Sequence, residues 1–220
     1  MLKLYDCTTA PSPRRARMLL AEKNIDCENI QIDLRSGEQM GEAFRAINSR
    51  CTVPVLVTEN GNTLTSNAEI LAYIEAQYPD HPLTGTTPEE KARIAKWNWR
   101  VEYEGLSAIA EALRNASPAM KDRALPGPRN VKLAQRGLSR IAWFFEDLNA
   151  QLENNAYVAG DSYSVADITA TITVDFARWV KVYPLETQTA LLKWHKAMSC
   201  LLYTSPSPRD QRGSRMPSSA

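Results

Sequence analysis

The stretch TVPVLVTENGNTLTSNAEILAYIEAQYP, residues 52–79, decides the fold because it predicts two strands and a helix in one continuous unit. Its opening run, VPVLV, is apolar and mostly β-branched, which suits a buried strand. The dipeptide Asn60-Gly61 is typical of a tight hairpin turn, so residues 63–64 are expected to return antiparallel. The stretch therefore predicts a β-hairpin that leads into a helix.

The helix after the hairpin carries its own start and stop signals. Ser66 and Glu69 have the spacing of a capping box, and Pro79 ends the helix.

A cis bond between Val53 and Pro54, which X-Pro sequences permit, would turn the backbone of Val53 outward, free to pair with an extended ligand. A free strand edge beside a helix N-terminus favours a short acidic peptide as that ligand. An ordinary hairpin–helix unit is the alternative.

Upstream of the hairpin, apolar periodicity predicts a strand, a helix, a strand and a helix, at residues 2–5, 14–23, 27–34 and 42–47. A strand, a helix and a strand within about thirty residues indicate a right-handed βαβ unit. Ser12 is expected to cap the first helix, and Pro13 fits its first position. Together with the hairpin and its helix, this order predicts a thioredoxin-like α/β domain over residues 1–80.

Beyond that domain the strand signals cease. Residues 81–87 contain Pro and Gly without periodicity and predict a linker. Residues 88–198 carry helical periodicity and predict an all-α helical-bundle domain. Thr87 and Glu90 have the spacing of a capping box, which predicts that its first helix runs over residues 88–113. Residues 199–220 are rich in Ser, Pro and Arg, which predicts a disordered tail. This tail also resembles translated adaptor sequence at the ends of assembled genes, so we expect a sequencing or assembly artefact and a different native C-terminus.

Composition argues against several classes of function. The chain has 26 Lys and Arg against 25 Asp and Glu, so neither nucleic acid nor a membrane surface is an expected partner. Long apolar runs are missing, so no transmembrane helix is predicted, and the first residues predict a strand rather than a signal peptide. Four cysteines without paired spacing and two histidines favour a reduced, cytoplasmic protein without a metal site.

Four features resemble the two-domain glutathione transferase family: the order of elements, the Val53-Pro54 hairpin, the capped helix that ends at Tyr78-Pro79, and the Ser164-x-x-Asp167 box. The segment APSPRRARMLLAEK is also similar to the first helix of bacterial members. The resemblance covers residues 1–198. It implies a homodimer whose first domain binds glutathione, the co-substrate, and whose helical domain supplies the second-substrate pocket. The implied reaction is detoxification, in which the glutathione thiolate attacks a small electrophile.

Such an enzyme must keep the thiol of glutathione ionised near neutral pH. A free thiol has a pKa of about 8.5, and each unit of depression needs about 1.4 kcal/mol of preference for the thiolate. The resemblance places the usual catalytic Ser or Cys at Ala10, which has no side-chain donor. We therefore expect Ser12, and next Thr9, to be the catalytic donor, with the backbone N–H groups of the loop as a third option. A simple helix cap is the alternative role of Ser12.

For the tripeptide, the resemblance implies that Val53 pairs with the cysteinyl unit and that Ser66 and Asn67 donate to the γ-glutamyl carboxylate. Gln39 is similar in position to family residues that meet the glycyl end, and Arg50 is a charged alternative for the same carboxylate. A solvated surface arginine is the simpler interpretation of Arg50. The expected glutathione-binding residues are therefore Gln39, Arg50, Val53, Pro54, Ser66 and Asn67.

Trp99 and Tyr103 fall on the first helix of the second domain and are the candidates for the second-substrate pocket, with core packing as the alternative. Two other functions stay open. The absence of a donor at Ala10 favours a non-catalytic glutathione-binding or interaction module. A glutathione-dependent disulfide reductase lacks the expected CxxC motif, although two bound glutathiones could replace it.

Overall fold

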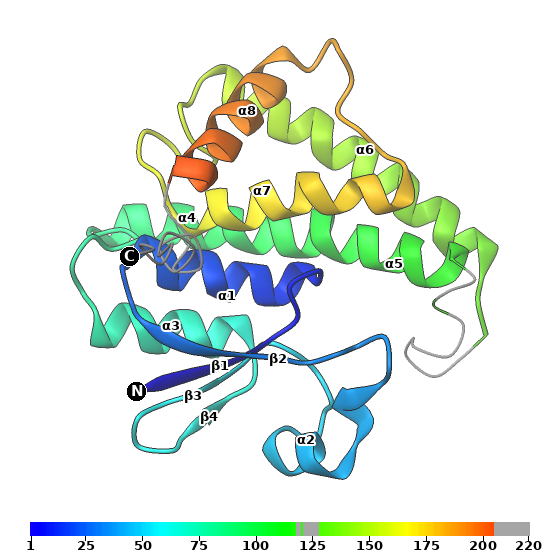
Figure 1. Cartoon of the computed structure of the whole chain (residues 1–220). Coiled ribbons are helices and arrows are strands. Elements are labelled where there is room, and N and C mark those ends of the chain that lie inside the picture. Colours follow the sequence, from blue (N-terminus) through cyan, green and yellow to red (C-terminus); the bar gives the residue numbers. More distant parts are fainter. Residues whose placement is uncertain (118–119, 121–127, 205–220) are drawn as a thin grey trace, which may run out of the picture.

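The computed structural model describes residues 1–117, 120 and 128–204, with side chains up to residue 199. An α/β unit and a helical unit lie against each other (Figure 1). The first unit contains β1 Leu2–Asp6, α1 Pro11–Glu22, β2 Cys27–Gln31, η1 Glu38–Met40, α2 Glu42–Ile47, β3 Val55–Val57, β4 Thr63–Leu64 and α3 Asn67–Gln77. The second contains α4 Pro88–Arg100, η2 Val101–Leu106, α5 Ser107–Ala116, α6 Val131–Glu153, α7 Val165–Ala177, η4 Arg178–Val180 and α8 Thr189–Thr204.

The sheet has the order β2-β1-β3-β4, which confirms the thioredoxin-like arrangement predicted for the first domain. β1 pairs with β2 in parallel, because α1 carries the chain across from one strand to the next. β3 pairs antiparallel with both β1 and β4. Gly61 has a φ of +81° in the hairpin turn, a conformation that glycine adopts without steric cost. The hairpin therefore brings the chain from the sheet to the start of α3.

The capping boxes predicted from the sequence are present at the starts of α3, α4 and α7. At α3, the hydroxyl of Ser66 accepts from the N–H of Glu69 at 3.2 Å, and the Glu69 carboxylate accepts from the N–H of Ser66 at 3.0 Å. At α7, the carboxylate of Asp167 is fully buried and accepts from the N–H of Ser164 at 3.0 Å. Local side-chain chemistry therefore determines where these three helices begin.

The long first helix of the second domain is not regular throughout. The sequence predicts one helix over residues 88–113, whereas the structure has α4, the π-helical segment η2 and then α5. Gly105 lies within η2, where a Cβ atom would come within 2.8 Å of the side chains of Phe144 and Thr173. The glycine thus lets α6 and α7 pack closely against this helix.

The last helix also differs from expectation. α8 continues to Thr204, past the domain boundary predicted at residue 198. The first helix-breaking residue of that part of the sequence is Pro206, which explains why the helix does not end sooner. The rest of the predicted tail, residues 205–220, lies outside the described part of the chain. Within the described part, no helix is long and apolar enough to cross a membrane.

One hydrophobic core joins the two units, with Leu4, Leu19 and Ile70 of the first in the same cluster as Ile94 and Ile172 of the second. Figure 1 shows α1 between the sheet and α7, so α1 is the element that both units share. The start of α1 consequently lies at the junction of the two units, where a ligand bound to the sheet edge would meet the helical domain.

Candidate functional site

The start of α1 differs from the prediction. Ser12 does not cap the helix and Pro13 is not its first residue, because Pro11 already supplies the fixed backbone angle that suits the first helical position. The N-cap residue is Ala10, with an extended backbone at φ −84° and ψ 140°, and no side chain caps this helix end. Ser12 therefore lies inside the first turn, and its hydroxyl is not used to cap its own helix.

This helix end leaves hydrogen-bonding groups open. Pro11 and Pro13 have no N–H, so the N–H of Ser12 is the donor that the first turn presents. Among the described residues, neither this N–H nor the Ser12 hydroxyl has a hydrogen-bond partner. Ser12 itself is half-buried. An anion placed beside Ala10 would thus find two donors and the positive end of α1.

The loop before α1 forms a tight turn, in which the N–H of Ala10 donates to the carbonyl of Cys7 at 2.9 Å. Thr9 is exposed at the tip, with its hydroxyl 3.5 Å from the Cys7 sulfur. Thr9 is therefore next to the open end of α1, as the sequence predicts, and its hydroxyl has a weak partner only.

The starts of α1 and α3 lie side by side. The amide of Asn67 donates from Nδ2 to the backbone carbonyl of Ser12 at 3.2 Å, so the structure brings these two predicted residues together. Ser66, the N-cap of α3, accepts a hydrogen bond from the N–H of Glu69 with its hydroxyl oxygen, and its side chain also contacts the Glu69 carboxylate. The N–H of Thr65 holds the pKa of the Glu69 carboxyl below its usual value, so this carboxylate is committed to the capping box. The N-termini of α1 and α3, which both carry partial positive charge, therefore face the same region.

Val53 provides an open backbone beside these helix ends. The Val53–Pro54 peptide bond is cis, and Val53 precedes β3 without joining its ladder, which begins with the pair Tyr5 and Val55. Within the described residues, the N–H and C=O groups of Val53 form no hydrogen bond. Pro54 is buried beneath them. An extended peptide could pair with Val53 as an added strand.

Gln39 and Arg50 lie on the α2 side of the sheet. Gln39 is half-buried in η1, and its Oε1 atom is buried without a hydrogen-bond partner in the described structure. Arg50 is exposed in the loop after α2, where its N–H donates to the side-chain oxygen of Asn48 at 3.0 Å. Among the described residues, no hydrogen bond connects either of them to Ser12 or Asn67.

Trp99 and Tyr103 stack on each other, with ring centroids 5.1 Å apart and planes 14° from parallel, and both are more than half exposed. The Arg140 guanidinium of α6 lies 5.4 Å from the Tyr103 ring, and its Nη2 donates to the Tyr103 carbonyl. Glu102, between the two aromatic residues, instead pairs with Arg15 of α1. The aromatic pair therefore turns toward α6, while the neighbouring face of the same helix turns toward α1.

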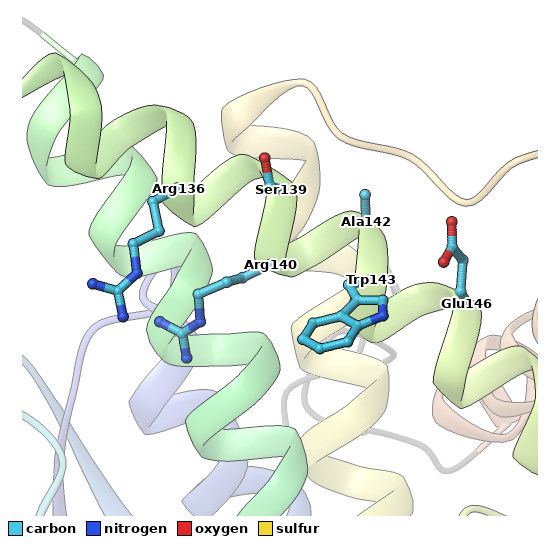
Figure 2. A pocket seen from close by; sticks show the side chains of 6 residues that line it. All are labelled: Arg136, Ser139, Arg140, Ala142, Trp143 and Glu146. Atoms are coloured by element: carbon cyan, nitrogen blue, oxygen red, sulfur yellow. The ribbon is translucent and has the colours of Figure 1, made fainter.

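The surface beside Tyr103 is a groove of about 540 Å³, with α6 as one wall. Figure 2 shows Arg136, Arg140 and Trp143 of α6 pointing to the same side of that helix. Trp143 is the most exposed large hydrophobic side chain of the described residues, at 75%. We call Trp99, Tyr103, Arg136, Arg140 and Trp143 the aromatic–arginine surface.

An ion pair between α1 and the helical unit was not predicted from the sequence. Arg14 donates to Asp175 of α7 at 2.7 Å, and His195 of α8 lies 3.0 Å from the other oxygen of the same carboxylate. Burial alone would raise the pKa of Asp175, but the hydrogen bonds from His195 and Arg14 bring this pKa below its ordinary value. Nothing local in the sequence signals this contact, because the three residues come from separate elements.

Within the described part of the chain, no three His, Cys, Asp or Glu side chains gather as a metal site.

Two family models match this chain. Residues 9–77 match the model of the glutathione S-transferase N-terminal domain, and residues 112–201 match that of the C-terminal domain. Glutathione S-transferase 2 of Saccharomyces cerevisiae is 35% identical over 198 residues, which cover 89% of this chain and 84% of the yeast protein.

Solved structures are similar over nearly the whole chain. The crystal structure of Gtt2 from Saccharomyces cerevisiae has a TM-score of 0.83 at 32% identity, covering 96% of this chain and 99% of that one. A glutathione S-transferase domain-containing protein of Marinobacter aquaeolei has a TM-score of 0.84 at 30% identity, covering 93% of this chain and 100% of that one.

Proposed function

The chain belongs to the glutathione S-transferase family, and on that premise we propose that it conjugates glutathione to a small electrophile by attack of the thiolate. The observation that carries this proposal is the open start of α1, with the free N–H and hydroxyl of Ser12, beside the start of α3 and the unpaired backbone of Val53. Thiolate, carboxylate and peptide backbone are the three kinds of group that glutathione would bring to these positions.

In this proposal the thiolate takes the place of the missing cap on α1. Ala10 offers no acceptor, so the N–H of Ser12 would donate to the sulfur, and the Ser12 hydroxyl would add a second donor. One hydrogen bond to a charged group contributes about 1.5–3 kcal/mol. A helix N-terminus adds about 0.3–1 kcal/mol. Together these contributions can lower the thiol pKa by about one to three units, enough to ionise it near neutral pH.

The rest of the tripeptide would follow the strand edge. Val53 would pair with the cysteinyl unit, and Ser66 and Asn67 at the start of α3 would donate to the γ-glutamyl carboxylate. The unpartnered side-chain amide of Gln39 could turn its Nε2 donor toward the glycyl carboxylate, with Arg50 as the charged alternative.

We also propose a homodimer. The aromatic–arginine surface combines exposed Trp and Tyr side chains with arginines, the residue types that dominate binding energy at protein interfaces. Trp99 and Tyr103 stay predictions as second-substrate residues, since their contacts run along α6 rather than α1. A non-catalytic glutathione-binding module is the second candidate function, because Ala10 leaves α1 without the usual catalytic side chain.

A calorimetric titration with glutathione, followed by conjugation and disulfide-reduction assays on the same sample, tests the proposal. Conjugation of an aromatic halide such as 1-chloro-2,4-dinitrobenzene is the expected result. Binding of glutathione without conjugation or disulfide reduction would favour the non-catalytic module, and disulfide reduction alone would favour the reductase. Failure to bind glutathione would refute the proposal.

A further inference from the structure

A polar network around one buried carboxylate holds the loop between β1 and α1, residues 7–10, and the site residues described above do not include it. Its centre is Asp6, the last residue of β1, whose side chain is 1% exposed. Arg17 of α1 forms an ion pair with Oδ1 of this carboxylate. Asn29 and Gln31 of β2 donate to Oδ2 at 3.0 Å and 2.7 Å. Three elements of the chain, β1, α1 and β2, thus meet around one carboxylate.

The network reaches the loop at Thr8. Oε1 of Gln31 accepts from the N–H of Thr8 at 3.0 Å and from its hydroxyl at 2.6 Å. Arg17 donates from Nη2 to the Thr8 carbonyl at 3.2 Å. The N–H, hydroxyl and carbonyl of Thr8 are therefore all held by two side chains that Asp6 also contacts. Thr9 and Ala10 follow directly, so the position of Thr8 determines where their peptide planes lie.

The charges and hydrogen bonds of the network fix which way its side chains face. A buried carboxylate is costly unless its charge is paired and its oxygens accept hydrogen bonds, and Asp6 has one cation and two neutral donors. Because Gln31 donates to Asp6 from Nε2, its Oε1 must face the other way, toward Thr8. An apolar side chain in the same place could fill the space but could not orient the loop.

We propose that Asp6, Arg17 and Gln31 are positioning residues, which act through Thr8 to fix the loop and the start of α1 in the geometry that ionises the glutathione thiol. This inference rests on the proposed function. Hydrogen bonds weaken steeply when donor and acceptor are misaligned. A displacement of about 1 Å in a reacting geometry can cost on the order of a hundredfold in rate. A loop held at all three groups of Thr8 avoids that loss.

The test compares Thr8→Val with Thr8→Ser, and both with Gln31→Leu. Thr8→Val removes only the hydroxyl at nearly constant shape, whereas Thr8→Ser keeps it. We expect Thr8→Val and Gln31→Leu to raise the pKa of the bound thiol by about half a unit to one unit and to lower kcat near pH 6.5 about three- to tenfold. KM for glutathione should change less than about twofold, and Thr8→Ser should behave as the unchanged protein. Thr187→Val, at an exposed threonine, is the control.

A purely structural role predicts a different pattern. If Thr8→Val and Gln31→Leu lower the melting temperature but leave kcat and the thiol pKa unchanged, the positioning role is refuted. Equal losses in Thr8→Val and Thr8→Ser would also refute it. Should the unchanged protein neither bind nor ionise glutathione, the proposed function fails on its own. Amide hydrogen exchange at Thr9 and Ala10 then decides whether the loop is positioned: faster exchange by about tenfold in Gln31→Leu supports the network, and equal exchange overturns it.

Discussion

Ala10 is the N-cap of α1 and has no capping side chain, so in the proposed function other groups would have to activate the thiol. With no donor there, the nearest free groups are the N–H and hydroxyl of Ser12, followed by the hydroxyl of Thr9. Ser12 stays a predicted donor, whereas its expected role as the helix cap is wrong, since the helix starts one proline earlier than expected. Its hydroxyl is available because Ala10, not Ser12, occupies the N-cap.

At this scale the prediction concerns Ser12→Ala. The change keeps the backbone N–H but removes the hydroxyl donor, so the bound thiol should have a higher pKa. We expect turnover at neutral pH to fall about ten- to a hundredfold while glutathione affinity stays nearly constant. Raising the pH should recover part of the loss, because the thiol then ionises without help. Thr9→Ala is the control and should do less.

The measurement is an absorbance titration of the bound thiolate in both variants. A larger rise in the pKa of the bound thiol in Thr9→Ala than in Ser12→Ala would make Thr9 the main donor and Ser12 the lesser one. No shift in either would leave the backbone N–H of Ser12 as the activating group.

At the scale of elements, the start of α3 should hold the γ-glutamyl carboxylate. Replacing Ser66 and Asn67 together by alanine removes two donors, and we expect binding to weaken by about 1.5–3 kcal/mol, the range for hydrogen bonds to a charged group. The same change removes the α3 cap, so calorimetry must be done well below the melting temperature. Unchanged affinity in the folded double variant would contradict this placement.

The contacts of Asp175 with Arg14 and His195, which join α7 to α1 and α8, make the free energy of unfolding depend on pH. The pKa of Asp175 is lower in the folded state than in the unfolded chain, so its contribution is fully present above about pH 4 and is lost as the pH falls through the folded pKa. We expect Asp175→Asn to lower the free energy of unfolding by about 1–2 kcal/mol at pH 7. The difference between the two proteins should shrink toward zero at acidic pH.

Urea unfolding of both proteins at several pH values measures this dependence. Asp161→Asn, at an exposed carboxylate, is the matched control. A difference that stays constant, or grows, as the pH falls would contradict the assignment of these contacts to an ionised Asp175.

Elements differ in how far the sequence predicts them. The hairpin and the capping boxes at Ser66, Thr87 and Ser164 depend on residues within a few positions of each other, and the sequence predicts them correctly. The π segment at Gly105 depends on close packing by α6 and α7, which no local pattern contains. The contacts from Asp6 to Arg17 and from Arg14 to Asp175 likewise join distant elements, so only the folded chain reveals them.

At the scale of the whole molecule, the aromatic–arginine surface is the proposed contact between two copies. The groove beside this surface is lined by both cations, such as Arg136, and anions, such as Asp147, so two identical copies can match each other in charge across a twofold axis. The two units of one chain already share a single core, so this surface is not needed to join them.

Trp143→Ala tests this contact. Interface tryptophans commonly carry a large share of binding energy, so we expect the dimer dissociation constant to rise at least about tenfold. Analytical ultracentrifugation over a range of concentrations measures it. Trp179→Ala is the matched control, because Trp179 is also exposed, at 54%, but lies on η4 outside this surface. An unchanged protein that is monomeric at high concentration, or equal effects of both variants, would contradict the proposed contact.

The most direct test of thiol activation by the open start of α1 is the pKa of glutathione bound to the unchanged protein, followed by thiolate absorbance against pH. With the Ser12 donors and the α1 N-terminus acting together, the pKa should fall from about 8.5 to about 7. A bound thiol that titrates near 8.5, at saturating glutathione, would show that the protein holds the tripeptide without activating it.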